Sequence, residues 1–255
     1  MFSKKLTKIL VLALVLVFAT TMTALADTRT TKAVKGSAKI DGEIESAWKA
    51  AEQVAIDLVI GSPTATAVAR TMWDEKNLYI LVEVKDDVLD DANADAWEKD
   101  SVEIYIDQNN AKTATYEDDD IQFRVNYKNE TSSRGAYYEA VKDSIQTAAK
   151  TVDGGWMAEV AIPWSTLEAK EGTVIGFDLQ INDAKDGSRA GILKWNDTAD
   201  KAHGNTSVFG NLELVGPAAL PQTGASFPVY VLYAAAALLL VGGIVLQVRK
   251  LALSK

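Results

Sequence analysis

The amino-acid sequence predicts an all-β fold, and specifically an antiparallel β-sandwich. Apolar and polar residues alternate with a period of two in short runs, which Gly, Asn, Asp and Pro separate. No long segment shows a competing helical period. Ten short strands in one domain are typical of a sandwich. The predicted strands are residues 67–73, 78–86, 101–107, 121–127, 136–142, 145–151, 156–162, 174–182, 189–195 and 208–214.

The predicted helices are short. One lies near residues 44–51 with Trp48 facing inward, and the other is a single turn after Pro163. The remaining tryptophans, except Trp97, lie on apolar faces or beside strand ends, where buried rings are common. We therefore expect core positions for Trp48, Trp73, Trp156, Trp164 and Trp195.

The N-terminal segment is typical of a secretory signal peptide. Residues 1–26 contain three lysines, then an apolar run, then the small-residue sequence Ala24-Leu25-Ala26. Cleavage there leaves Asp27 as the new N-terminus, and residues 27–33 form a short arm before the sandwich of residues 34–215. The alternative is a short anchoring helix that is never cut.

The C-terminal segment contains the pentapeptide "LPQTG" at 220–224, within a linker at 216–224. Residues 225–255 hold an uncharged span, 228–248, long enough to cross a bilayer as a transmembrane helix, and then Arg249 and Lys250. This order resembles a sortase sorting signal. The resemblance implies cleavage between Thr223 and Gly224 and covalent attachment to the peptidoglycan of a Gram-positive wall, with membrane contact only in the precursor. A plain C-terminal anchor is the alternative.

The mature chain is strongly acidic. Residues 27–223 hold 20 basic and 35 acidic side chains, a formal net charge of −15. Such a charge repels phosphate backbones and anionic wall polymers, so we expect a neutral partner and no nucleic acid. The chain has no cysteine, so core burial or bound metal must stabilise the domain.

Three predicted strands present polar faces of an unusual composition. Alternation places apolar residues on one face and planar hydrogen-bonding groups on the other. Such groups form paired hydrogen bonds with vicinal hydroxyls, and an indole such as Trp97 stacks on a sugar ring. A solvated outer face is the plainer interpretation of any single strand. The polar sets are Glu103, Tyr105 and Asp107; Gln122, Arg124 and Asn126; and Asp178, Gln180 and Asn182.

Ordered blocks along residues 34–215 resemble a family 9 carbohydrate-binding module. They include "KIDGEIESAW" (39–48), "WDEKNLYILVEVKD" (73–86), "WEKDSVEIYIDQNN" (97–110), "YEDDDIQFRVNY" (116–127), "AIPW" (161–164), "IGFDLQIND" (175–183) and "FGNLEL" (209–214). The resemblance implies a β-sandwich of the immunoglobulin-like or jelly-roll-like, DOMON-like type with structural calcium. It also implies a non-catalytic module that binds reducing ends of β-1,4-glucan or xylan chains between two tryptophans.

Carried over by position, the resemblance places Trp97 as the first stacking tryptophan and Glu103, Arg124 and Gln180 as sugar-binding residues. His203, the only histidine, stands where the second tryptophan is expected. An imidazole can stack and donate a hydrogen bond but covers less area. Further candidates for sugar binding are Gln122, Asn182 and Asp200.

Acidic runs offer oxygen ligands for calcium. They are Asp86-Asp87, Asp90-Asp91 and 117–120. They lack EF-hand spacing, so the cation follows from the resemblance and no particular ligand is assigned. Solvated loops are the alternative.

Two other functions compete with sugar binding. Sandwich folds of this kind include haem-binding electron-transfer modules, and His203 with Met72 or Met157 could ligate iron. A hydrolase needs a facing carboxylate pair, but the sequence shows no Ser-His-Asp order and no metal-binding histidine cluster. We therefore expect an exported, wall-anchored binding protein that is not an enzyme, with plant-type oligosaccharides as partners.

Overall fold

The computed structural model describes residues 28–218. The predicted signal peptide, the sorting motif with Thr223 and Gly224, and the apolar span 228–248 lie outside the described residues. Among residues 28–218, no helix has the length and apolarity needed to cross a membrane.

Strands dominate the described chain. They are β1 (Thr30–Lys35), β2 (Val54–Ile56), β3 (Leu58–Gly61), β4 (Thr66–Trp73), β5 (Asn77–Lys85), β6 (Ser101–Asp107), β7 (Asp120–Asn126), β8 (Thr131–Arg134), β9 (Gln146–Val152), β10 (Gly155–Pro163), β11 (Val174–Lys185), β12 (Ser188–Lys194) and β13 (Gly210–Val215). The helical elements are short: η1 (Ser46–Ala50), η2 (Ala96–Glu98), α2 (Ala136–Val141), η3 (Lys142–Ser144) and η4 (Thr206–Val208).

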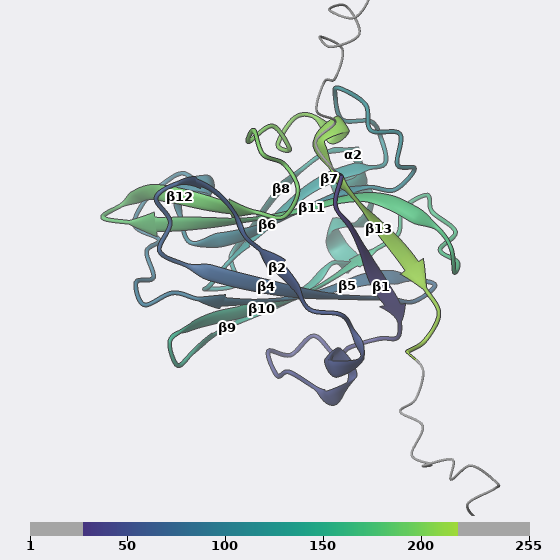
Figure 1. Cartoon of the computed structure of the whole chain (residues 1–255), viewed down its shortest axis with the longest axis horizontal. Helices are drawn as coiled ribbons and strands as arrows, with labels where there is room; N and C mark the ends of the chain where they lie inside the picture. Colours follow the sequence, from purple (N-terminus) through teal and green to yellow (C-terminus); the bar gives the residue numbers. More distant parts are fainter. Residues whose placement is uncertain (1–27, 219–255) are drawn as a thin grey trace, which may run out of the picture. The chain divides into compact units, whose positions relative to one another are not determined.

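Within residues 28–218, thirteen strands form one curled sheet that folds into two layers (Figure 1). One layer contains β8, β7, β6 and β11, with β12 and β3 beyond β11, and the other contains β4, β5, β10 and β9, with β2 beside β4. β13 and β1 connect the layers, because β13 pairs with β11 while β1 pairs with both β13 and β4. The predicted all-β, sandwich-like fold is confirmed.

β1 departs from the predicted pattern in two ways. Its residues 30–35 belong to the sheet, although residues 27–33 were expected to form an arm. Its pairings with β13 and β4 are parallel, whereas every pairing was expected to be antiparallel. The N-terminal strand enters between the final strand and β4, so its direction is set by that insertion and not by a hairpin.

Nine of the ten predicted strands are present, and residues 136–142 are the exception. They form α2 and continue into η3. Tyr137 and Val141 are buried together because residues four apart share a helix face. Gly135 fixes the entry to this helix: its φ is +109°, and a Cβ would lie 2.6 Å from the carbonyl oxygen of Asp120.

The helix predicted at residues 44–51 is confirmed as the 3₁₀ turn η1, with Trp48 fully buried. The turn predicted after Pro163 is wrong. There the N–H groups of Ser165 and Leu167 donate to the side-chain oxygen of Gln108, so they do not start a helix.

The main core fills the space between the layers and includes Trp73, Trp156, Phe177 and Trp195. Two smaller clusters cover the outer faces. Trp48, Met72 and Met157 belong to the cluster outside β4, β5 and β10, whereas Tyr105, Ala202 and Phe209 form the cluster outside β6. The predicted core positions of the tryptophans are confirmed, with Trp164 partly buried against the main core.

Candidate functional site

A cross-strand row of polar residues runs across one layer. Antiparallel register places Ser132 of β8 opposite Arg124 of β7, Arg124 opposite Glu103 of β6, Glu103 opposite Gln180 of β11, and Gln180 opposite Lys194 of β12. Side chains on neighbouring strands that share a face lie close enough to bond. The alternation of each strand thus becomes one continuous polar surface.

A second row lies beside the first. It contains Arg134, Gln122, Tyr105 and Asp178, each opposite the next. Most of these side chains are buried, so the surface is not a solvated outer face. Buried polar groups require partners, and these groups bond one another.

Glu103 is the centre of this network and is 2% exposed. Its Oε1 accepts from Nε and Nη2 of Arg124, at 3.0 and 2.8 Å, and from Asn182 at 2.8 Å. Its Oε2 accepts from the Tyr105 hydroxyl at 2.6 Å and from Gln122. Burial raises the pKa of Glu103, but the Arg124 charge and the hydrogen bonds outweigh it, so the pKa is lowered. Glu103 is therefore an anion held in one orientation.

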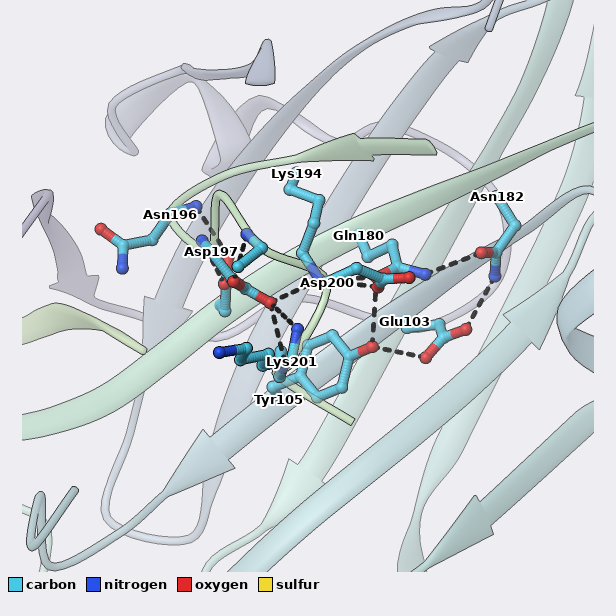
Figure 2. A network of polar contacts seen from close by, with 12 residues as sticks. Glu103, Tyr105, Gln180, Asn182, Lys194, Asn196, Asp197, Asp200 and Lys201 are labelled. Carbon is cyan, nitrogen blue, oxygen red and sulfur yellow. Dashed lines mark hydrogen bonds and ion pairs between the residues drawn. The ribbon is translucent and has the colours of Figure 1, made fainter. Parts of the chain in front are cut away.

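Lys194 ties this network to the neighbouring loop (Figure 2). It is 0% exposed, and its Nζ donates to Gln180 Oε1 at 2.8 Å and to Asp200 Oδ1 at 3.3 Å and forms an ion pair with Asp197 Oδ2 at 2.9 Å. A buried ammonium is stable only with such partners. Because Gln180 Oε1 accepts from Lys194, the orientation of the Gln180 amide is fixed. Its Nε2 donates one hydrogen to Asn182 Oδ1, and its second N–H is left for a ligand.

The loop of residues 196–205 follows β12, and two buried aspartates accept its backbone N–H groups. The Asp197 carboxylate accepts hydrogen bonds from the N–H groups of Ala199, Lys201 and Ala202. Burial alone would raise the pKa of Asp197, but the charge of Lys194 and these hydrogen bonds outweigh it, so the pKa is lowered. Asp178 accepts the N–H groups of Asn196 and Asp197. These bonds place His203 and Asp200 beside the polar rows.

A cavity of about 380 Å³ lies over the rows. The polar rows form its floor, Trp97 projects from η2, and Asp200 and His203 come from the 196–205 loop. Trp97 is 46% exposed, unlike the five core tryptophans. The lining residues are Trp97, Glu103, Tyr105, Gln122, Arg124, Ser132, Ser133, Arg134, Gln180, Arg189, Asp200 and His203.

The structure brings the predicted site residues together. Trp97, Glu103, Arg124, Gln180 and His203 all line the cavity, and so do Gln122 and Asp200. Asn182 does not line it. Asn182 is fully buried on the same face of β11 as Gln180, beside the floor, where it donates to Glu103 and to the Ser101 hydroxyl.

Sequence reasoning missed several residues of the site. Tyr105 was placed on the polar face but was not selected, although it alternates with Glu103. Lys194 and Arg189 belong to the predicted strand 189–195, where a long buried side chain gives no signal in sequence. Arg134 ends β8, a strand that was not predicted. For these residues the signal is cross-strand register, which one sequence does not supply.

The haem alternative requires His203 and a methionine on one iron atom. Met72 and Met157 are buried on the outer face of the opposite layer, packed with Trp48. His203 lines the cavity outside β6 and β7. The structure therefore does not bring this ligand pair together.

Two groups of carboxylates within residues 28–218 converge as metal ligands do. Asp86, Asp100 and Asp183 form one group, and Asp107, Asp119 and Asp120 form the other. Of the predicted acidic runs, Asp86, Asp119 and Asp120 take part.

Unsatisfied oxygens in these groups suit a hard cation. Asp86 Oδ2 and Asp120 Oδ1 are buried without hydrogen-bond partners. Burial raises the pKa of Asp100 and of Asp120 to about 7. Calcium prefers such carboxylate oxygens, so the residues present fit this ion. Asp90 and Asp91 belong to neither group. Asp90 accepts a hydrogen bond from the N–H of Gly187, and Asp91 forms an ion pair with Lys128.

Comparison with known families identifies the domain. The family described as carbohydrate family 9 binding domain-like matches residues 40–217. The chain belongs to this family. The carbohydrate family 9 module is a carbohydrate-binding, non-catalytic domain, and the floor of hydrogen-bonding groups beside an exposed indole is its candidate site.

Relatives of this family 9 module occur in large enzymes. The chain is 48% identical over 184 residues to endo-1,4-beta-xylanase A of Thermotoga neapolitana, a match that covers 71% of this chain. It is 43% identical over 186 residues to the exoglucanase XynX of Acetivibrio thermocellus, covering 72% of this chain. The match spans 17% of the length of each relative.

Solved structures agree with the family. A family 9 module from Caldicellulosiruptor kristjanssonii, solved in complex with cellotriose, is 30% identical with a TM-score of 0.70. The match covers 77% of this chain and 100% of that one. The same module solved with glucose gives a TM-score of 0.70.

Proposed function

We propose that this module binds the reducing end of a β-1,4-linked glucan or xylan chain in the cavity between Trp97 and His203, without turning it over. The observation that carries the proposal is the floor formed by the polar rows, to which Glu103, Arg124 and Gln180 contribute, beside an indole that is 46% exposed. A related module was solved with glucose alone, which supports a site for a single terminal sugar.

Each side chain of the site would make a different type of contact with the sugar. The Trp97 indole presents an apolar face to the C–H face of a sugar ring. Arg124 and Gln180 supply fixed N–H donors, Gln122 adds a polar group on the floor, and Asp200 adds one at the wall. Asn182 holds Glu103 from the next position on the same face of β11. Because the protein groups are already oriented, binding orders few side chains, which favours affinity.

Calorimetry on the purified protein tests the end-binding mode. Cellotriose and xylotriose are titrated beside the same sugars reduced with borohydride, which opens the terminal ring. We expect binding of the intact sugars and a loss of at least about tenfold on reduction, because a fixed site rejects a ligand that leaves its polar groups unpaired. Equal binding of intact and reduced sugars would refute the end-binding mode.

We further propose that the module is exported and joined to the peptidoglycan of a Gram-positive wall by sortase. The order of "LPQTG", uncharged span and basic residues supports this proposal, as does the N-terminal segment. A wall-attached module would hold glycans near the cell. The test is wall fractionation: the native protein should remain covalently bound, and deletion of 220–224 should release it or leave it in the membrane. Recovery of wall material that still ends at Lys255 excludes the sorting step.

Structural calcium is the third part of the proposal, and Asp86, Asp100 and Asp183 with Asp107, Asp119 and Asp120 would hold it. The unpartnered oxygens of Asp86 and Asp120 support it. Added calcium should raise the melting temperature of chelator-treated protein, and Asp120→Asn should reduce the increase. Asp153→Asn, outside both groups, is the control. No change with calcium in the wild-type protein would contradict the proposal.

A further inference from the structure

Three arginines line the cavity, and they differ in what they bind. Arg124 is paired with Glu103, with Nη2 at 2.8 Å from Oε1. Arg189 donates to Asn182 Oδ1 at 3.1 Å and lies 3.9 Å from Asp200. Arg134 makes no ion pair within residues 28–218, and its exposed guanidinium lies 5.9 Å from the centre of the Tyr116 ring. Arg134 is therefore a cation of the cavity that has no anionic partner among the described residues.

Arg134 belongs to the same wall as His203. Tyr116, on which the guanidinium of Arg134 stacks, donates its hydroxyl to the carbonyl oxygen of Ala202 at 2.8 Å. Ala202 precedes His203 in the loop. Tyr116 also packs edge-on against Phe209, which fixes its ring. The aromatic ring beside the Arg134 guanidinium is thus tied to the loop that carries His203.

The chemistry of a guanidinium favours one type of ligand group. Its planar fork forms two parallel hydrogen bonds with a carboxylate, and stacking on Tyr116 leaves the N–H edges free. A neutral sugar does not require an unpaired cation. The predicted mature chain carries a formal net charge of −15, which repels an anion at long range, but distant charges are screened beyond about 8 Å at physiological salt. Direct contact with Arg134 therefore dominates the interaction of a nearby carboxylate.

We propose that the cavity prefers an acidic oligosaccharide, one in which a sugar at or next to the bound end carries a carboxylate, and that Arg134 binds this group. Arg134 is then a specificity-determining residue. The inference rests on the proposed sugar-binding function and names its substrate class. A uronic acid branch on a xylan chain supplies this carboxylate and leaves the terminal ring closed, as the end-binding mode requires.

The experiment compares three ligands of equal length on the purified protein by calorimetry: a neutral xylo-oligosaccharide, the same chain with a glucuronic acid branch, and its aldonic acid form. We expect the branched chain to bind about fivefold more tightly than the neutral one at about 0.15 M salt, the upper range for an exposed ion pair. The preference should decrease at about 0.5 M salt because the pair is solvent-accessible. The aldonic acid form has an open terminal ring and should bind as weakly as the borohydride-reduced sugar.

Arg134→Gln should abolish the preference, so that the neutral and the branched chain bind with equal affinity. Arg70→Gln is the matched control: it removes the same charge on β4, where Arg70 pairs with Glu83, and should keep the preference. Equal affinity for the neutral and the branched chain in the wild-type protein, or a preference that survives in Arg134→Gln, overturns the inference. If no sugar binds, the proposed function itself fails.

Discussion

The two layers of the sandwich each bury a glutamate on the outer face, and they use it differently. Glu159 of β10 is 0% exposed and accepts from the Trp48 indole at 2.9 Å and from the N–H of Gly42 at 2.9 Å. Glu103 of β6 is 2% exposed and accepts only from side chains of its own layer. We call the covered surface around Glu159 the sealed face and the open surface around Glu103 the pocket face.

The two faces differ in the chain segments that cover them. On the sealed face, residues 36–51 lay Trp48 over the strands, and Gly42, with φ +80°, points its N–H at Glu159. On the pocket face, the loop of residues 196–205 and η2 leave a cavity of about 380 Å³. Polar groups on a strand therefore do not make a site by themselves. A site forms where the covering segments leave part of a satisfied polar surface accessible.

Trp48→Ala should give the largest effect on stability. The ring is fully buried in the sealed face, and removing a buried tryptophan costs roughly 3–5 kcal/mol of unfolding free energy. It also removes a donor to Glu159. Urea unfolding measures the loss, and calorimetry under folding conditions should show unchanged sugar affinity. A change in affinity without loss of stability would break the distinction between the two faces.

Trp97→Ala should have the opposite result. Its indole is 46% exposed, so the melting temperature should stay near that of the wild type. Binding of cellotriose or xylotriose should weaken by about 2 kcal/mol, because an aromatic platform carries much of the energy of such a contact. A destabilised variant with unchanged affinity would show that Trp97 supports the 87–96 loop and not a sugar.

The fold and much of the site follow from alternation in the sequence. The polar faces of residues 101–107, 121–127 and 174–182 were predicted, because period two identifies which side chains share a face. Their register was not, and register is what aligns Lys194 with Gln180 and Arg134 with Gln122. Both pairs lie in hairpins, so turn geometry sets their register, and between β11 and β12 the register also shifts at Asp183 and Ala184, which alternation alone does not show.

Burial of the polar faces also escaped prediction. A charged side chain such as Glu103 or Lys194 suggests solvent in a single sequence. Here the 196–205 loop and neighbouring strands satisfy these groups, so they are buried. The helix at 136–141 was missed because Tyr137 and Val141 fit a strand as well as a helix over so short a run.

His203→Trp sharpens the comparison by extending the pocket wall. A larger ring at this exposed position should tighten binding by about 1 kcal/mol if the wall contacts the sugar. His203→Ala is the control and should weaken binding slightly. Calorimetry decides between the cases: an unchanged affinity in both variants would mean that the 196–205 loop has another role.

The two glutamates should also respond to pH with opposite signs. The pKa of Glu103 is lowered, because Arg124 and its hydrogen bonds outweigh burial. Its contribution to stability is present above the unfolded pKa and is lost as pH falls. Burial raises the pKa of Glu159, so its contribution is present at low pH and is lost as pH rises through the folded pKa.

Unfolding free energies from about pH 3.5 to about pH 7 test this difference, since stability follows the protons bound in the folded and unfolded states. The wild-type value minus that of Glu103→Gln should rise with pH below the reference pKa of 4.5, because only the wild type gains an ionised, paired Glu103. The wild-type value minus that of Glu159→Gln should fall as pH rises above 4.5. Slopes of the same sign would show that both carboxylates experience one environment, and the pocket face would then hold no charge prepared for a ligand.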